Sequence, residues 1–398
     1  MSPQASADLH GEIAKAIRGN NFQRADIAIR SLLQREPESA EAHLLLAELA
    51  ARLERWHVHA NALKSATSLG AVPPAKSHDQ QFQRSQTGHL LVCEWGHGFW
   101  SDVAHVLGSM LLAEMTRRTP VVHWSNASLF SPGDNENAWN LYFEPIGPNL
   151  QLLPPEAEFF PSPWSNEALN SQAFCQVRLD RPGGSYGIGL LPRHEQMVVS
   201  DTYVGVPDLW PWLEPGDVDF GTSPVEAKRR LARKYLRFRP HLVAAVDSIW
   251  SQQMAGRRWL AVHIRGSDKG VELDNLEEVN NLYPKIIDDW ISKNETGAIF
   301  LMTDSIQQYF KMKERYGSRI LALKNIRTQR KIGVHLGRND PVKVAEQVII
   351  DTLLASRCEE FLGNGASNVS LAVECLKVWP VGAYRLIGPD WRDVRFAL

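Results

Sequence analysis

The chain has 398 residues, about 2.7 times the ~150 residues typical of one domain, so two or three structural units are expected. Hydrophobic residues make up 44% and charged residues 22%, which excludes a disordered chain, a collagen and a small disulfide-framed protein. The 43 Lys and Arg against 45 Asp and Glu give a net charge of −2, so no overall attraction to nucleic acid or to an anionic membrane is expected.

The cysteines and the N-terminus indicate a compartment. Cys93, Cys175, Cys358 and Cys375 are isolated, so neither a zinc site nor a disulfide framework is expected. The sequence has no apolar run of about 18 residues, and its first ten residues lack the basic and apolar regions of a signal peptide. We therefore expect a cytoplasmic protein without a membrane span.

Residues 1–70 are predicted to form a small helical unit. Ala, Leu, Glu and Arg recur there at helical spacing, and Phe22 lies 34 residues before Trp56. A period of 34 is that of the tetratricopeptide repeat, which this segment resembles. Such a unit either offers a groove to a protein partner or caps the next domain. Residues 71–87, rich in Pro, Gln and Ser, indicate a linker.

After the linker, short apolar runs alternate with helical stretches, which is typical of doubly wound α/β domains. Strands are predicted at 90–93, 120–124, 259–264, 298–302, 320–323 and 360–363. Helices are predicted at 101–117, 276–293, 305–316, 341–356 and 367–378. Residues 130–215 have the composition of an irregular loop region, and 224–254 that of a long helical stretch. We expect Rossmann-like domains over 88–223 and 224–398, with a ligand at the carboxyl ends of their strands.

The most informative motif follows a buried strand. His263 and Arg265 lie on one side of that strand at period 2, and Asp268 and Lys269 follow a turn at Gly266. An Arg fork binds two oxygens of a diphosphate at once, and a nearby Lys adds positive charge. The motif therefore predicts an anion site, and the alternative is a structural Arg–Asp ion pair.

Two further stretches place polar residues beside apolar elements. Thr303 and Asp304 end a predicted strand. Asp351 lies in an otherwise apolar helix and needs a donor partner, which is either a nucleobase or a neighbouring core group. Ser367 and Asn368 lie in a Gly-rich turn that begins a helix, where backbone N–H groups can hold phosphate oxygens.

Together these motifs resemble those of the GDP-fucose-dependent fucosyltransferases of the α1,6 and protein O-fucosyl superfamily. The matching motifs, in chain order, are His263–Lys269, Asp304, Asp351 and Gly365–Ser370. The stretches 94–102 and 140–145 are similar to the N-terminal half of the nodulation-type α1,6-fucosyltransferases. The resemblance covers roughly residues 88–380 and leaves the helical repeat segment outside.

The resemblance implies roles for the phosphate-binding residues. Arg265 would bind the β-phosphate and assist departure of the leaving group, with Lys269 beside it, and Ser367 and Asn368 would bind the diphosphate. The second Arg of the family's Arg-Arg pair is Gly266 here, which leaves the acceptor class open.

The resemblance also implies how the rest of the donor is held. His263 and Asp351 would contact guanine, and Asp304 the ribose or a nearby loop. Thr303 belongs to the same strand end as Asp304, and we expect the loop Gly96-His97-Gly98 to face the nucleotide sugar across the cleft.

The family architecture is the two-Rossmann GT-B type, which inverts the anomeric configuration and needs no metal or other cofactor. Asp217-Val-Asp219 has the form of a metal-binding carboxylate pair, but its Pro and Gly neighbours indicate a turn. The general base is expected to be Glu272, Asp268 or His97.

The predicted function is therefore transfer of a sugar, foremost fucose from GDP-fucose, to a glycan or protein hydroxyl. Two alternatives remain open: another nucleotide sugar is the donor, or the chain is a binding protein whose transferase domain is inactive.

Overall fold

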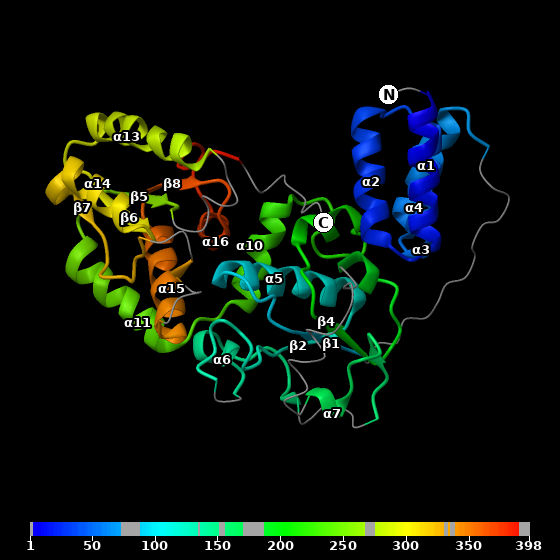
Figure 1. The fold of residues 1–398 in the computed structure, drawn as a ribbon, viewed down its shortest axis with the longest axis horizontal. Helices are drawn as coiled ribbons and strands as arrows, with labels where there is room; N and C mark the ends of the chain where they lie inside the picture. Colours follow the sequence, from blue (N-terminus) through cyan, green and yellow to red (C-terminus); the bar gives the residue numbers. More distant parts are fainter. Residues whose placement is uncertain are drawn as a thin grey trace.

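The computed structural model describes residues 3–72, 88–133, 136–150, 156–169, 187–266, 275–329, 333–334 and 339–389. In Figure 1 the helical unit lies at the right, a first α/β half in the middle and a second α/β half at the left.

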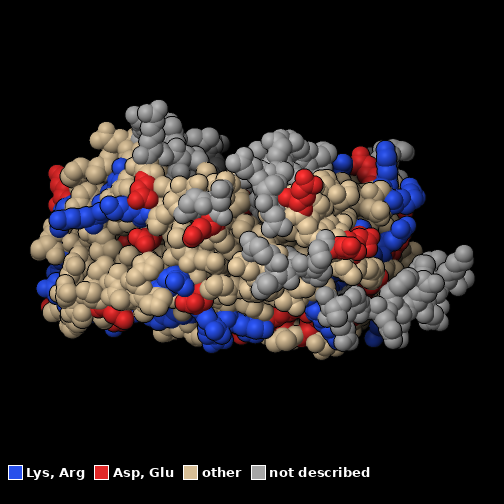
Figure 2. Space-filling view, turned by 90° about the horizontal axis from the view of Figure 1, so that it is seen from below, with Lys and Arg blue, Asp and Glu red and all other residues tan. Residues whose placement is uncertain are grey.

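The surface carries charges of both signs. On the face shown in Figure 2, basic and acidic side chains are interspersed, as the net charge of −2 leads one to expect. Across the described residues, no helix combines the length and the apolar character that a membrane crossing requires.

The helical unit consists of α1 (Pro3–Arg18), α2 (Phe22–Arg35), α3 (Ala40–Arg52) and α4 (Trp56–Ser68). Its geometry repeats at the spacing of 34 residues found in the sequence. The turns between paired helices contain the equivalent residues Asn20 and Glu54, whose φ angles are 57° and 56°. That the helices form tetratricopeptide repeats stays a prediction.

The helical unit packs on the first half through buried side chains. Arg55, only 2% exposed, lies 3.6 Å from Asp217 through its Nη1 atom. The backbone N–H of His57 donates to Glu214 Oε2 at 2.9 Å. Apolar side chains of α2 belong to the same core cluster as those of the first half. The unit is therefore a fixed part of the molecule, which supports the cap interpretation.

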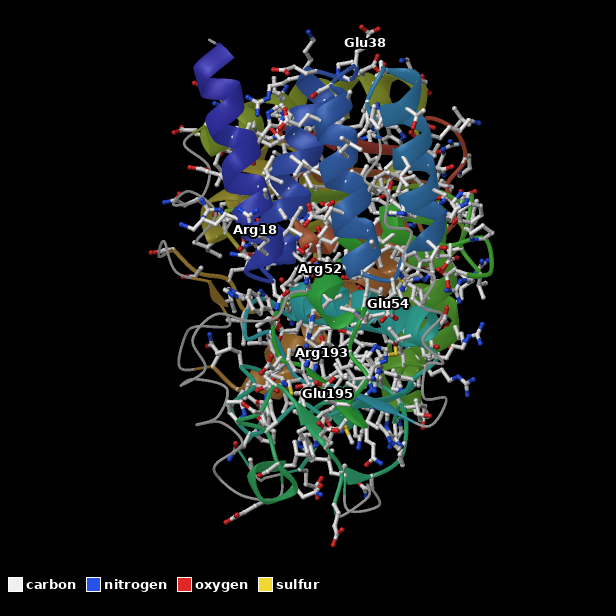
Figure 3. The ribbon with its side chains drawn as sticks, turned by 90° about the vertical axis from the view of Figure 1, so that its right-hand side faces the viewer. Arg18, Glu38, Arg52, Glu54, Arg193 and Glu195 are labelled. Carbon is white, nitrogen blue, oxygen red and sulfur yellow. The ribbon has the colours of Figure 1, made fainter. Side chains whose placement is uncertain are left out.

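A second contact fastens the segment 193–195 beneath the helices. The Arg118 guanidinium donates to the carbonyl oxygens of Arg193 and Glu195, both at 2.7 Å. His194 Nε2 lies 3.1 Å from Glu54 Oε1. Figure 3 looks onto this junction, with Glu54 above Arg193 and Glu195. The segment thus joins the first half to the helical unit.

The first half contains a four-stranded parallel sheet in the order β2-β1-β4-β3. Its strands are β1 (His89–Val92), β2 (Thr119–Val122), β3 (Phe159–Phe160) and β4 (Met197–Ser200). Its helices are α5 (Phe99–Thr116), α6 (Trp139–Tyr142), α7 (Asn166–Leu169), η2 (Gly187–Leu190), α9 (Val206–Leu209) and η3 (Trp210–Trp212).

The region 130–215, predicted to be an irregular loop region, also supplies β3 and the inner strand β4, which were not predicted. The sequence signal of β4 is a run of only four residues, Met197 to Ser200, which is short for a strand prediction. All four are buried, as in parallel strands covered on both faces.

The second half contains a five-stranded parallel sheet in the order β7-β6-β5-β8-β9. Its strands are β5 (Trp259–Ile264), β6 (Ala298–Thr303), β7 (Ile320–Leu321), β8 (Glu360–Asn364) and β9 (Tyr384–Ile387). Its helices are α10 (Pro224–Tyr235), α11 (Pro240–Ile249), η4 (Trp250–Met254), α13 (Leu276–Lys293), α14 (Ile306–Tyr316), η5 (Gly317–Arg319), α15 (Pro341–Arg357) and α16 (Asn368–Leu376).

The stretch 224–254 is not one helix. It divides into α10, α11 and η4, because Pro240 lacks the N–H that a continuing helix needs and occupies the start of α11 instead.

Several tryptophans of the first half are buried. Trp124, Trp139, Trp164 and Trp212 are at most 2% exposed. These four side chains belong to the core of the first half.

The two halves meet through α5. Its Trp100 Nε1 donates to Thr352 Oγ1 of α15 at 2.9 Å, and Glu114 near its end accepts from Arg230 of α10 at 3.1 Å. The loop after β1 leads directly into α5, so the carboxyl edge of the first sheet lies beside α15.

Candidate functional site

Three of the predicted motifs meet at one edge of the second sheet. Arg265 follows β5, Asp304 follows β6 and Ser367 lies just after β8, and these strands are neighbours in the order β6-β5-β8. Because the strands are parallel, their carboxyl ends lie together, at the edge where such sheets bind ligands.

Arg265 is held in place by Asp304. Its Nη1 donates to Asp304 Oδ2 at 2.7 Å, while the Gly266 N–H donates to Oδ1 at 3.0 Å. The side chains of Arg265 and Asp304 are 16% and 15% exposed. Asn280 Nδ2 donates to the Arg265 carbonyl at 2.8 Å. Asp304 thus orients the guanidinium and the loop after it.

Gly266 has no room for a side chain. A Cβ atom there would lie 2.4 Å from Ser305 Cβ. Ser305 is itself fixed, since its N–H donates to Thr303 Oγ1 at 3.2 Å and its side chain caps α14. The close packing of these strand ends therefore requires glycine at position 266.

His263 is a neutral, buried side chain. It is 4% exposed, and its Nδ1 shares a hydrogen bond of 3.0 Å with Ser370 Oγ. Burial, reinforced by the positive charge of Arg265, lowers the pKa of His263 to about 3. A ligand that contacts His263 therefore meets an uncharged imidazole.

Asp351 is buried with one oxygen uncommitted. Asn325 Nδ2 donates to Asp351 Oδ2 at 2.7 Å, whereas Oδ1 has no hydrogen-bond partner among the described residues. Burial raises the pKa of Asp351 to about 7, although Asn325 and the charge of Arg327 lower it in part. A buried carboxylate with an open acceptor fits a ligand that donates hydrogen bonds.

The turn after β8 retains hydrogen-bonding groups. Ser367 precedes α16, is 2% exposed and makes no capping bond. The Ala366 N–H donates to Asn364 Oδ1 at 2.9 Å, and Asn364 Nδ2 is buried with no partner among the described residues. The turn therefore brings side-chain donors to the amino end of a helix, where anions bind favourably.

Asn368, the first residue of α16, faces a space between the halves. It lines a cavity of about 60 Å³ together with apolar side chains of α5 and α16. Trp100 and Leu107 line it from the first half, and Cys375 and Leu376 from the second.

Asp268, Lys269 and Glu272 lie outside the described residues, in the interval 267–274. Their assignment as a cation and as candidate bases stays a prediction.

The loop Gly96-His97-Gly98 lies between β1 and α5. The backbone N–H groups of Gly96 and His97 donate to Asp102 Oδ1 at 3.1 and 3.0 Å. His97 is exposed, with its ring 5.0 Å from that of Trp95. Asp102 holds the backbone of the loop and leaves the His97 imidazole accessible to solvent.

Two other titratable groups, Glu94 and His123, lie at the carboxyl edge of the first sheet and are less suited to proton transfer than His97. The Glu94 carboxylate is fully buried and accepts from the N–H and hydroxyl of Ser125 at 3.0 and 2.8 Å. Burial lowers the pKa of His123 to about 4.

Asp217-Val-Asp219 forms the predicted turn. Asp217 pairs with Arg55, and Asp219 Oδ1 accepts from Arg230 Nε at 2.7 Å. Within the part of the chain that the structure describes, no group of three or more His, Cys, Asp and Glu side chains is arranged to hold a metal ion.

Sequence reasoning missed Asn325 and Asn364. Neither belongs to an apolar pattern, and asparagines are common in turns, so only their contacts distinguish them. Asn364 does lie in the Gly-rich turn, where any side-chain donor is a candidate.

No family model and no curated protein matches the sequence. Several solved structures resemble the fold. Fucosyltransferase NodZ from Bradyrhizobium shares 17% identity over 72% of this chain and 92% of that chain, with a TM-score of 0.46. POFUT1 in complex with GDP shares 13% over 75% and 98%, with a TM-score of 0.45. A FUT1 mutant of Arabidopsis thaliana in complex with GDP shares 12% over 76% and 70%, with a TM-score of 0.44. These values describe a distant likeness of fold.

Proposed function

We propose that the chain is a glycosyltransferase that moves fucose from GDP-fucose to a hydroxyl of a glycan or a protein. The observation that carries the proposal is the convergence of Arg265, the Gly-rich turn and Asp351 beside one carboxyl sheet edge. An oriented guanidinium beside a helix start suits a diphosphate. A carboxylate with an open acceptor oxygen suits a base that presents N–H groups.

In this proposal the phosphates are bound by cations and hydrogen-bond donors. Arg265 binds the β-phosphate, kept in orientation by Asp304, and Lys269 adds a second positive charge. Ser367 and Asn368 bind the diphosphate at the start of α16. As the sugar–phosphate bond breaks, negative charge grows on the departing GDP, and these groups stabilise it.

The guanine is bound by Asp351 and the neutral His263. Its N1–H and N2–H₂ groups are donors, and the uncommitted Asp351 oxygen is an acceptor. Asp304 holds Arg265 and the loop at Gly266. Thr303 supports this strand end through its hydrogen bond with Ser305.

The reaction inverts the anomeric carbon, within a GT-B arrangement of two Rossmann-like halves. The acceptor oxygen attacks that carbon, the bond to the β-phosphate oxygen breaks, and a base takes the hydroxyl proton. His97 is the candidate base from the first half, and Asp268 and Glu272 are those from the second. We propose no metal and no further cofactor, since Arg265 and Lys269 supply positive charge.

The helical unit is assigned a structural role in this proposal, since it is packed into the first half. A protein partner on its outer face is a further role that the tetratricopeptide-like pattern suggests.

Replacing Arg265 tests the proposal. Purified protein is expected to release GDP from GDP-fucose in the presence of EDTA and an acceptor hydroxyl. Arg265→Ala is expected to lower that rate about 100-fold or more, the effect of removing one preorganised charge partner.

The matched control is Arg258→Ala. Arg258 also pairs with a carboxylate, Glu360, at 3.1 Å, but it precedes β5 and so lies at the opposite edge of the same sheet. Its variant should keep the wild-type rate. Full activity of Arg265→Ala would exclude the proposed site, and turnover of UDP-sugars alone would favour another donor.

A further inference from the structure

The segment 322–329, after β7, is anchored beside the proposed guanine site at two points. The Thr328 N–H donates to the Asp304 carbonyl at 2.8 Å. The Ile326 N–H donates to Gln347 Oε1 of α15 at 3.1 Å. The segment therefore bridges the end of β6 and the helix that carries Asp351.

Asn325 directly precedes the anchor at Ile326, and its side-chain amide binds Asp351. Its Nδ2 donates to Asp351 Oδ2 at 2.7 Å, which leaves Oδ1 as the oxygen without a described partner. Asp351 is 9% exposed, so its orientation is decided by protein contacts and not by water. An asparagine amide has no charge, so it orients the carboxylate without neutralising it.

We propose that Asn325 is a positioning residue that makes the site selective for guanine. It holds Asp351 so that Oδ1 meets the N1–H and N2–H₂ donors of the base. Adenine presents an acceptor at N1, which a carboxylate oxygen repels. With adenine bound, the buried Asp351 oxygen would stay unpaired, so the site should reject adenine strongly. This inference rests on the proposed function, since it assumes that the ligand is a guanine nucleotide.

Asn325 also affects the charge of Asp351. Its hydrogen bond favours the ionised carboxylate, whose pKa burial raises to about 7. The charged group that acts on Asp351 from the same segment is Arg327, and the neighbouring Thr352 meets the uncharged Trp100 from α5. Loss of the Asn325 donor should therefore raise the pKa of Asp351 further. Protonated Asp351 is a poorer acceptor for guanine.

The test is calorimetric titration of the full chain with GDP and with ADP, from about pH 6 to about pH 9, around the region where Asp351 titrates. For the wild type, GDP affinity should fall as the pH drops through about 7. Asn325→Ala should weaken GDP binding about tenfold at neutral pH, the effect of one lost hydrogen bond to a charged group. It should also move the midpoint of the pH profile upward and reduce the preference for GDP over ADP.

Asn281→Ala is the control. Asn281 is exposed and also bonds a side chain, Lys311 Nζ at 3.0 Å, so its loss should leave the affinity and the midpoint unchanged. Asn325→Asp removes the donor at constant shape and serves as the second variant if Asn325→Ala does not fold. It should weaken GDP binding more, because it sets two carboxylates together.

The outcomes separate the two proposals. Suppose that the wild type binds GDP and that the Asn325 variants bind it with the same affinity and the same pH midpoint. This result would overturn the positioning role and leave the proposed function standing. A wild-type chain that binds no GDP at any pH would overturn both.

Discussion

At the scale of single residues, Asp351 shows the conflict between binding and stability most clearly. Its ordinary pKa is 3.8, and burial raises it to about 7 in the folded chain. Between about pH 4 and about pH 7 the folded state therefore keeps a proton that the unfolded state has lost. The free energy of unfolding falls as the pH rises through this window and stays lower above it.

Asp351→Asn should therefore stabilise the protein, and more so at about pH 8 than at about pH 5, because it removes the cost of a buried charge. Thermal unfolding at the two pH values measures the difference. Asp289→Asn, an exposed aspartate on α13, serves as the control and should shift both midpoints equally. An Asp351→Asn variant destabilised at the higher pH would contradict the assignment of Asp351 as a strained, functional carboxylate.

Sequence reasoning located Arg265, Asp304 and Asp351 because each is a polar residue attached to an apolar element. It did not anticipate that Arg265 and Asp304 pair with each other, since their distance along the chain hides their adjacency in the sheet. Asn325 was missed for the same reason, because it follows no strand directly and its role depends on α15.

At the scale of elements, prediction worked where capping residues mark the ends. The helix predicted at 305–316 matches α14 to within a residue, with Ser305 as its N-cap. The helix predicted at 341–356 matches α15 to within a residue, with Asp340 as its N-cap and Pro341 in its first turn. The four-residue strand β4 was missed, because a short buried strand among prolines has too little pattern to recognise.

The backbone is strained at Arg117, the residue that ends α5. Arg117 caps this helix in the left-handed region, with φ 56°, where a side chain costs about 1 to 2 kcal/mol and glycine does not. Arg117→Gly should raise the free energy of unfolding by about 0.5 to 1 kcal/mol, less than the full strain because glycine also frees the unfolded chain.

Urea unfolding of this variant checks the prediction. Asn20→Gly, at a similar φ of 57°, is the comparison and should gain less, since asparagine tolerates this region better than arginine. If Arg117→Gly is less stable than the wild type, the contacts of the arginine side chain contribute more to stability than its backbone strain costs.

At the scale of the whole molecule, the core is continuous across its parts. One cluster of buried side chains contains Ile29 of the helical unit, Trp124 of the first half and Ile349 of α15. Contacts such as that of His57 with Glu214 join residues far apart in the sequence, so no local pattern indicated them. We expect the described parts to unfold together, so that a ligand bound at the second half stabilises all of them.

The proposed function requires that the carboxyl edge of the second sheet bind guanosine diphosphate. Thermal unfolding of the wild-type chain in EDTA, alone and with GDP, ADP or UDP, tests it most directly. GDP at about 100 times its dissociation constant should raise the free energy of unfolding by about 2.7 kcal/mol, with little effect of ADP or UDP at the same concentration. A transition that GDP leaves unmoved, or that all three nucleotides raise equally, would contradict the claim.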